Sequence, residues 1–313
     1  MSPPGGVAVF APAPKVTVTV EQAAEGGPEV HFHAGGQGFW VARMIAGLGL
    51  PVTLCGAFGG EAGLVARVLI EHEGVTVRVV VAPTRVTGAY VHDRRSGERR
   101  PVAEMESMEL DRHHLDDLYG ATLVAGLDAG VCVLTGQDAA PHVPADVFRR
   151  LAADLRENGA RVVADLSDDN LSEAVKGGVD VLKVSDDELV RSGWAEGDDP
   201  EQLVAAIHRL RKAGASAVIV SRADEPALAA VGDQVLWIKG PTVEAVDPRG
   251  SGDSMTAALA VGLATGMSVE DSLRLATAAG GLNATRRGLA TGERREIQRL
   301  ATHAEVRPYE PAG

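Results

Sequence analysis

From Val131 onward, short apolar runs alternate with helical segments, and this alternation restricts the fold more than any other feature of the sequence. Apolar runs bounded by turn residues are typical of buried strands. Those in this half of the chain are Val131–Leu134, Arg161–Ala164, Val181–Val184 and Ala217–Val220. Strands that alternate with helices form a parallel sheet with helices on both faces. We therefore predict an α/β fold with a mostly parallel central sheet.

The first third of the chain contains further strand-like runs that this alternation does not explain. These runs are rich in β-branched residues, and they are Val16–Val20, Val75–Val81, Val86–His92 and Arg99–Ala103. Ser96-Gly97 marks a hairpin turn between the third and the fourth of them. We predict that these runs form a small sheet of their own. The interpretation is one α/β domain over residues 1–313, with a β-sheet lid formed by two insertions at about 14–33 and 84–104.

Composition excludes several classes of protein. A chain of 313 residues with 45% hydrophobic content can bury one large core, and it contains neither a membrane-length apolar run nor a leader pattern, so we expect a soluble, cytoplasmic protein. The net charge of −13 argues against a nucleic-acid partner. Cys55 and Cys132 lie in apolar runs and are expected to be buried free thiols. The close pairs His31/His33 and His113/His114 have no third ligand at metal-binding spacing, which favours lid or surface histidines.

The segment with the strongest chemical signal is Gly250-Ser251-Gly252-Asp253, which leads into an alanine-rich helix. Two glycines allow a tight turn whose N–H groups point the same way, directly before the unpaired amides of a helix N-terminus. Such a turn suits a phosphoryl group during transfer, and Asp253 can accept a proton from the attacking hydroxyl. The alternative interpretation is an ordinary helix entry capped by aspartate.

Two motifs resemble the signatures of the ribokinase-like (PfkB) carbohydrate kinases. The segment Asp247-Pro248-Arg249-Gly250-Ser251-Gly252-Asp253 is similar to D-T-x-G-A-G-D, and Gly35-Gly36-Gln37-Gly38-Phe39-Trp40-Val41-Ala42 is similar to G-G-x-G-x-N-x-A, with Trp40 in place of asparagine. The resemblance extends over nearly the whole chain and is closest to the 1-phosphofructokinase and tagatose-6-phosphate kinase branch. It implies a ribokinase-like fold, ATP and Mg²⁺ as cofactors, and a monovalent cation such as K⁺.

The resemblance also implies roles on the nucleotide side. Lys183, Ser185 and Glu188 match the family segment K-x-N-x-x-E, in which the glutamate helps to hold magnesium and the nucleotide phosphates. Ser221 and Arg222 match a segment that borders the nucleotide, Asn283 matches a position near the adenine, and Asp247 matches a cation site. For Asn283 a buried amide bonded to the backbone is an equal alternative, and for Arg222 so is a solvated loop arginine. Ala223 and Pro226 replace glycines of the family, so we expect this loop to follow a different path.

The acceptor side departs most from the family. The matching positions are Lys15, Gly35, Gly36, Gln37, Trp40 and Arg85. Lys15 stands where the family has an aspartate that holds sugar hydroxyls, and Gln37 stands where phosphosugar kinases have a lysine. Arg85 matches an arginine that meets the substrate phosphate. Because the other positions have changed, we expect fructose 6-phosphate and fructose 1-phosphate to be poor acceptors.

The function that these observations favour is ATP-dependent phosphorylation of a hydroxyl of a sugar, sugar phosphate or sugar-like small molecule. One alternative is a catalytically weak or inactive kinase-fold protein with a binding or regulatory role. Another is a kinase for a nucleoside or other non-sugar alcohol, since Trp40 could stack on a flat ring. We expect a homodimer formed through the lid, because a small sheet cannot bury its apolar side alone.

Overall fold

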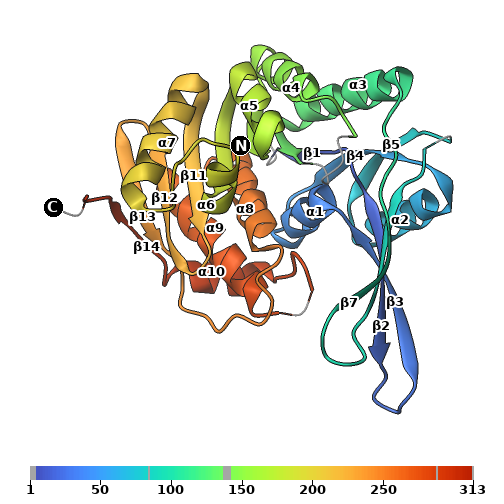
Figure 1. Ribbon diagram of the computed structural model, residues 1–313. Helices are drawn as coiled ribbons and strands as arrows, with labels where there is room; N and C mark the ends of the chain where they lie inside the picture. The colour runs from blue at the N-terminus through green and yellow to red at the C-terminus, as the bar shows by residue number, and fades with distance from the viewer. Residues whose placement is uncertain (1–4, 84, 137–141, 287, 312–313) are drawn as a thin grey trace.

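The computed structural model describes residues 5–83, 85–136, 142–286 and 288–311. A large sheet with helices on both faces forms the body of the molecule, and a second, smaller sheet projects from it (Figure 1). Residue 84, at the predicted start of the second lid insertion, lies outside the described residues. No helix in the described ranges is long and apolar enough to span a membrane.

The large sheet has ten strands in the order β14-β13-β12-β11-β10-β9-β8-β1-β4-β5. Their bounds are β1 Val7–Ala11, β4 Val52–Phe58, β5 Thr76–Val81, β8 Val131–Thr135, β9 Arg161–Asp165, β10 Val179–Ser185, β11 Ala215–Arg222, β12 Glu225–Val231, β13 Gln234–Lys239 and β14 Glu305–Pro308. The strands from β5 to β11 are parallel, whereas β12, β13 and β14 are antiparallel. The central strands are continuous apolar runs because helices cover both of their faces.

Two hydrophobic clusters lie on the two faces of this sheet. The cluster on one face involves α1 Gln37–Gly47, α2 Gly60–His72, α8 Ser251–Thr265, α9 Val269–Ala284 and α10 Arg294–Ala301. The other involves α3 Arg112–Ala129, α4 Asp146–Glu157, α5 Asp168–Gly177, α6 Asp186–Arg191 and α7 Pro200–Ala213. The predicted helix starts at Asp199 and Ser268 are confirmed, since each side chain accepts a bond from a first-turn amide at 3.1 Å.

The second sheet has four strands in the order β3-β2-β6-β7, and we call it the lid sheet. Its strands are β2 Lys15–Gln22, β3 Pro28–Gly35, β6 Gly88–Asp93 and β7 Arg100–Met105. Thr17 pairs with His33 and Tyr90, and the next residue, Val18, pairs with Phe32. Because side chains alternate along a strand, one face of the lid sheet is polar and the other is apolar.

Two predictions about the sheets were wrong. The run Val75–Val81 was assigned to the small sheet, but β5 pairs with β4 at the edge of the large sheet. Its alternating exposure is that of an edge strand, and a local pattern does not reveal which sheet a strand joins. The antiparallel strands β12 and β13 were missed, because residues 221–226 were interpreted as a loop. Cys55 and Cys132 are buried free thiols, as predicted.

The connection from β11 to β12 corrects the premise of one expectation, that Ala223 does not adopt positive φ. Ala223 and Pro226 were expected to force a different path because neither adopts positive φ easily. Instead, Ala223 takes φ 43° in a two-residue turn, and Pro226 already lies in β12. Two-residue hairpin turns require positive φ, so the tight turn imposes on Ala223 a conformation that favours glycine.

Ala223→Gly is therefore expected to stabilise the protein. Left-handed backbone costs a non-glycine residue about 1–2 kcal/mol, and the extra freedom of glycine in the unfolded chain offsets part of this gain. We expect the free energy of unfolding, measured by urea denaturation, to rise by about 0.5–1 kcal/mol. Ala227→Gly, within β12, is the matched control and should destabilise the protein. A variant Ala223→Gly that is no more stable than the parent would contradict this prediction.

Candidate active site

The Gly-Ser-Gly-Asp segment forms the N-terminus of α8, as the sequence predicts. Gly250 precedes the helix with φ 77°, and a Cβ there would approach the amide nitrogen of Ala290 to 3.2 Å. The first helical bond runs from the Ser254 amide to the Gly250 carbonyl at 2.9 Å. The amides of Gly252 and Asp253 come before that bond in the helix, so they face outward without helical partners. This geometry suits a bound anion.

A buried ion pair that the sequence analysis missed lies directly behind this helix start. The Lys183 ammonium is 3.4 Å from the carboxylate of Asp165, the last residue of β9. Their side chains are only 6% and 2% exposed. The Thr256 hydroxyl donates to Asp165 at 2.6 Å and thereby joins α8 to the sheet. A signal was present in the sequence, because Asp165 directly follows an apolar run whose carboxyl end belongs to the ligand-binding edge of a parallel sheet.

Lys183 also reaches the turn of residues 250–253, which we call the anion-binding turn after the role proposed for it. A Cβ on Gly252 would lie 2.5 Å from the Lys183 ammonium nitrogen, so the absence of a side chain at Gly252 is what lets the cation lie against the turn. Burial opposes the charge on Lys183, but the nearby carboxylates of Asp165, Glu188 and Asp253 together raise its pKa. The lysine is therefore a permanent positive charge beneath the position where a phosphoryl group would lie.

The surroundings of Asp253 raise its pKa. Burial, followed by the charge of Asp165, raises its pKa to about 7, while Lys183 and a hydrogen bond from Gln37 act in the opposite direction. The Gln37 side chain also accepts a bond from the Gly136 amide at 2.6 Å. A base with a pKa close to neutral both ionises and accepts protons efficiently at neutral pH. Gln37, from the N-terminal glycine motif, is thus brought directly to Asp253.

Ser185 and Glu188 form a reciprocal cap at the start of α6. Ser185 accepts a bond from the Glu188 amide at 3.2 Å, and the Glu188 carboxylate accepts one from the Ser185 amide at 2.8 Å. One oxygen of Glu188 is used in this cap. Burial also raises the pKa of Asp165, and the charge of Glu188 adds to the rise, so the two carboxylates belong to the same electrostatic cluster. Magnesium ions commonly use one or two carboxylates together with substrate phosphates, and the second oxygen of Glu188 suits that role, whereas both oxygens of the buried Asp165 are bound by Lys183 and Thr256.

Ser221 and Arg222 lie at the end of β11, next to the tight turn. The guanidinium of Arg222 donates to the carbonyls of Pro226 and Asp198 at 3.4 and 3.3 Å, and these contacts are long for hydrogen bonds. The Ser221 hydroxyl is 3.5 Å from the Val184 carbonyl. Both residues therefore lie at the carboxyl edge of the sheet, on the strand adjacent to the one that carries Lys183.

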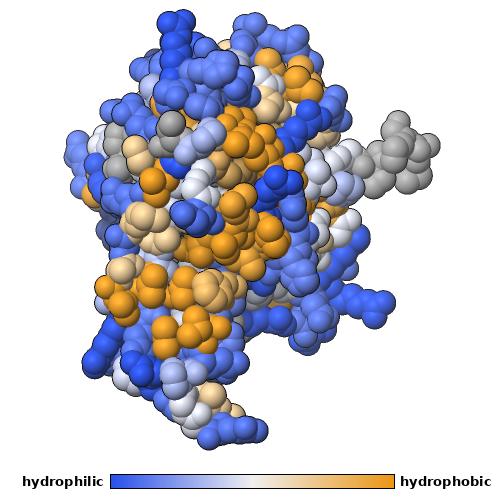
Figure 2. Space-filling view, turned by 90° about the vertical axis from the view of Figure 1, so that its right-hand side faces the viewer, coloured by the Kyte–Doolittle hydropathy of each residue, from blue (hydrophilic) through white to orange (hydrophobic). Residues whose placement is uncertain are grey.

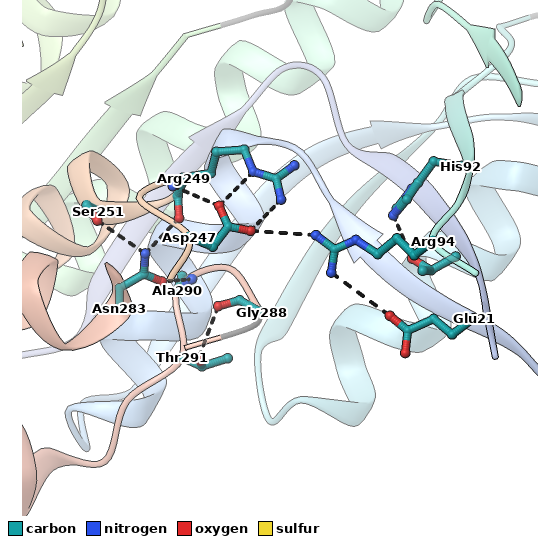
Figure 3. Close-up of polar contacts among 11 residues, drawn as sticks. Glu21, His92, Arg94, Asp247, Arg249, Ser251, Asn283, Gly288, Ala290 and Thr291 are labelled. Carbon is teal, nitrogen blue, oxygen red and sulfur yellow. Dashed lines mark hydrogen bonds and ion pairs between the residues drawn. The ribbon is translucent and has the colours of Figure 1, made fainter. Parts of the chain in front are cut away.

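The amide group of Asn283 is bound by the protein itself. Its side chain is fully buried, and its amide donates to the Arg249 carbonyl at 2.7 Å while its oxygen accepts from the Ala290 amide at 2.7 Å (Figure 3). A further contact at 3.3 Å reaches Ser251. The alternative of a satisfied buried amide therefore describes this residue, which fixes the loop in front of α8.

Asp247 does not offer a free carboxylate to a cation. Its side chain binds the guanidinium of Arg249, and Arg94, which follows β6 of the lid sheet, lies 3.6 Å away (Figure 3). Arg94 also lies 4.0 Å from Glu21 of β2. Two guanidinium groups neutralise the charge that a K⁺ ion would need, so the Asp247 side chain does not fit such a site in this arrangement. It instead joins the lid sheet to the anion-binding loop.

Four of the predicted acceptor residues lie around the start of α1 and the adjoining ends of β2 and β3. Lys15 begins β2 and forms an ion pair with Glu104 at 3.4 Å. Gly36 has φ 96°, and a Cβ there would meet the Ala13 carbonyl at 2.5 Å, while Gly35 ends β3 directly before it. Trp40 is partly buried and packs against the hydrophobic core.

Arg85 was expected to meet a substrate phosphate, but it is buried and 3% exposed. It donates to the carbonyls of Met108 at 2.9 Å, Ala57 at 3.1 Å and Pro12 at 2.9 Å. Burial lowers its pKa to about 10. Bonds to three separate segments are those of a structural arginine that holds the base of the lid sheet.

Comparison with known proteins identifies the class. Residues 14–295 match the model of the pfkB family carbohydrate kinases, so the chain belongs to that family of phosphotransferases. It is 31% identical over 274 residues to the ATP-dependent 6-phosphofructokinase isozyme 2 of Mycobacterium tuberculosis, covering 86% of this chain and 79% of that protein. It is 28% identical over 290 residues to the 1-phosphofructokinase of Escherichia coli, covering 88% of each. The phosphofructokinase-2 of Escherichia coli in complex with potassium superimposes with a TM-score of 0.84 at 25% identity, covering 95% of this chain and 98% of that one.

Asp253→Asn is expected to lower phosphoryl transfer about 10²-fold or more, because asparagine cannot accept a proton. Asparagine is uncharged and similar in shape, so the melting temperature should not fall. The matched control is Asp271→Asn, in the first turn of the neighbouring helix α9. The assay is steady-state turnover on the best acceptor found. Near-parental turnover in Asp253→Asn would remove this residue from the base role.

The pH dependence of turnover follows from the pKa of Asp253. An aspartate whose pKa is about 7 is protonated below that pH, so kcat should fall roughly tenfold per unit below pH 7 and level off above it. Gln37→Met removes a hydrogen bond that lowers this pKa, so the acidic limb should move to higher pH. A limb that stays below pH 5 in both proteins would show that another group supplies the base.

Proposed function

We propose that this protein catalyses ATP-dependent, magnesium-requiring phosphorylation of a hydroxyl group on a sugar or sugar derivative in the cytoplasm. The observation that carries the proposal is the convergence of Asp253, the outward amides of Gly252 and Asp253, and the Lys183 ammonium at one helix start. A base, an anion hole and a fixed cation are the groups that phosphoryl transfer requires.

The reaction follows from these positions. The acceptor oxygen attacks the terminal phosphorus of ATP, its proton passes to the Asp253 carboxylate, and the bond between that phosphorus and the leaving ADP oxygen breaks. The α8 amides and Lys183 stabilise the negative charge that spreads over the transferred group. When bound, magnesium neutralises charge on the nucleotide phosphates, and Glu188 is the residue proposed to hold it. Ser221 and Arg222 are proposed to border the nucleotide.

The proposed magnesium and monovalent-cation sites differ in how well the residues present fit them. The described residues contain no group of three or more His, Cys, Asp or Glu side chains arranged to hold a metal ion. Magnesium in kinases relies on phosphate and water ligands as well as carboxylates, so one carboxylate such as Glu188 can serve together with the nucleotide phosphates. A related phosphofructokinase-2 binds potassium. For this chain, a monovalent cation would need ligands other than the Asp247 side chain, which the two arginines occupy.

The acceptor is proposed to bind between the glycine motif and the polar face of the lid sheet. Gln37 reaches Asp253, and Arg94 of the lid lies against the loop that precedes α8. These contacts support the lid sheet as the cover of the acceptor. Trp40 packs on the core, and this packing gives no support to a nucleoside stacked on its ring. The assembled base and anion hole favour a working enzyme over an inactive binding protein.

The test is a panel of sugars and sugar phosphates assayed for ATP-dependent turnover, preceded by thermal-shift measurements with ATP and magnesium. Absence of ATP-dependent turnover on every sugar, with no ATP-induced shift, would contradict the proposed function.

Fructose 6-phosphate and fructose 1-phosphate are expected to be poor acceptors in this panel, although named relatives act on phosphosugars. Gln37 supplies no positive charge, and a lost charge-assisted bond to phosphate costs about 1.5–3 kcal/mol, or roughly one to two powers of ten in affinity. Gln37→Lys should raise kcat/KM for the phosphosugars about tenfold or more, whereas Gln37→Met should not. A parental kcat/KM near ~10⁵ M⁻¹s⁻¹ on either fructose phosphate would overturn this prediction.

We further propose that the apolar face of the lid sheet forms a homodimer interface. Figure 2, which views the side of α2 and the lid, shows hydrophobic residues gathered on this face. On this face of the lid sheet, Val30 and Phe32 are 51% and 55% exposed. An exposed apolar sheet face of this kind is typical of an interaction site.

Phe32→Glu is expected to convert a dimer into a monomer, because a charge at the centre of an apolar interface has no partner. Analytical ultracentrifugation of both proteins measures the mass. Val124→Glu, on the exposed side of α3, is the matched control and should leave the mass unchanged. A parent protein that sediments as a monomer at micromolar concentration would exclude the proposed interface.

A further inference from the structure

A cavity of about 370 Å³ lies near the amino ends of β9, β10 and β11, whereas the candidate active site lies at their carboxyl ends. Its walls are mainly apolar, with Val181, Ile219, Val231, Leu259, Leu263 and Leu273 among the lining residues. Pockets of this size with apolar walls and a few polar groups are typical of small-molecule sites. No residue of the candidate active site lines it.

The cavity is bounded by the same elements that carry the candidate active site. Strand β9 begins at Arg161 in the cavity wall and ends at Asp165, and β10 contributes Val181 to the cavity and Lys183 to the site. Strand β11 runs in the same direction, from Ala217 in the wall to Arg222. Helix α8 begins with the anion-binding turn, and Gly262 and Leu263 near its other end line the cavity.

Two charged side chains, Asp180 and Arg161, line the cavity, and only Asp180 forms an ion pair within the described residues. Asp180 forms an ion pair with Arg156 at 3.4 Å and accepts a bond from the Val162 amide at 2.8 Å. Arg161 donates to the Leu263 carbonyl at the end of α8. Among the ion pairs of the described residues, none involves Arg161. The cavity therefore has one arginine whose charge no carboxylate neutralises, and this charge is complementary to a ligand anion.

We propose that this cavity binds a small monocarboxylate with an apolar body and that its occupancy alters phosphoryl transfer. The apolar body fills the space between the sheet and helices α8 and α9, and the carboxylate pairs with Arg161. Binding itself is independent of the proposed function, whereas the effect on transfer rests on it. A ligand that binds differently to two arrangements of α8 would change nucleotide affinity at the other end of that helix.

Isothermal titration calorimetry of the intact protein with octanoate and with octan-1-ol tests the site. We expect saturable octanoate binding with a Kd of ~1 mM or tighter. Arg161→Gln should weaken octanoate binding about tenfold or more and leave octan-1-ol binding unchanged. Arg67→Gln, on the exposed side of α2, is the matched control. Ala217→Leu fills the cavity from β11 and should abolish binding of both probes, with its folding checked by circular dichroism. Octanoate binding that is absent, or that persists unchanged in both variants, would overturn the site.

The linkage to the active site is tested by titrating ATP and magnesium with and without saturating octanoate. We expect the nucleotide Kd to change about fivefold or more, and the octanoate Kd to change by the same factor when the nucleotide is saturating, because coupling is reciprocal. Octanoate binding with an unchanged nucleotide Kd would overturn the effector role. If the protein binds no nucleotide at all, the proposed kinase function fails while the calorimetric test of the cavity still stands.

Discussion

The buried ion pair between Lys183 and Asp165 is the interaction on which the arrangement of the candidate active site depends. Taking two charges out of water is costly unless both are paired and hydrogen-bonded. Here the Asp165 carboxylate pairs with the Lys183 ammonium at 3.4 Å and accepts a hydrogen bond from the Thr256 hydroxyl at 2.6 Å. These bonds join β9, β10 and α8 at one point. A shift of the helix would separate buried charges, so the pair fixes where the anion-binding turn lies above the sheet.

The two glycines of the turn have different structural roles. Gly250 supplies the positive φ with which the chain enters α8, whereas Gly252 leaves room for the Lys183 ammonium. A second fixed point comes from outside the sheet, where Arg94 of the lid sheet approaches Asp247 of the same loop. The turn is therefore held by two cations, the buried Lys183 of the large sheet and the partly exposed Arg94 of the lid sheet. Asn283 adds backbone bonds that keep the loop in shape.

Asp253 illustrates how the fold produces chemistry from an ordinary residue. An aspartate at the start of a helix is normally ionised and well solvated. Burial and the adjacent charge of Asp165 raise its pKa to about 7, and Lys183 limits the rise. The same cluster thus orders the helix and sets the proton affinity of this carboxylate. Because one cluster does both, inspection of the motif alone does not separate the structural role of these residues from their proposed catalytic role.

The sequence by itself determined the α/β class, the anion-binding turn and the family, because these depend on periodicity, on glycine geometry and on contiguous motifs. It did not determine partners that are distant along the chain. Asp165 lies 18 residues before Lys183, and its role depends on the adjacency of β9 and β10. Arg85, Asn283 and Asp247 occupy positions matched to ligand-binding residues, yet their polar groups are used by the protein itself. Only the tertiary structure decides such cases, because whether a polar side chain is free depends on which backbone carbonyls, amides and charges the fold brings within hydrogen-bonding distance.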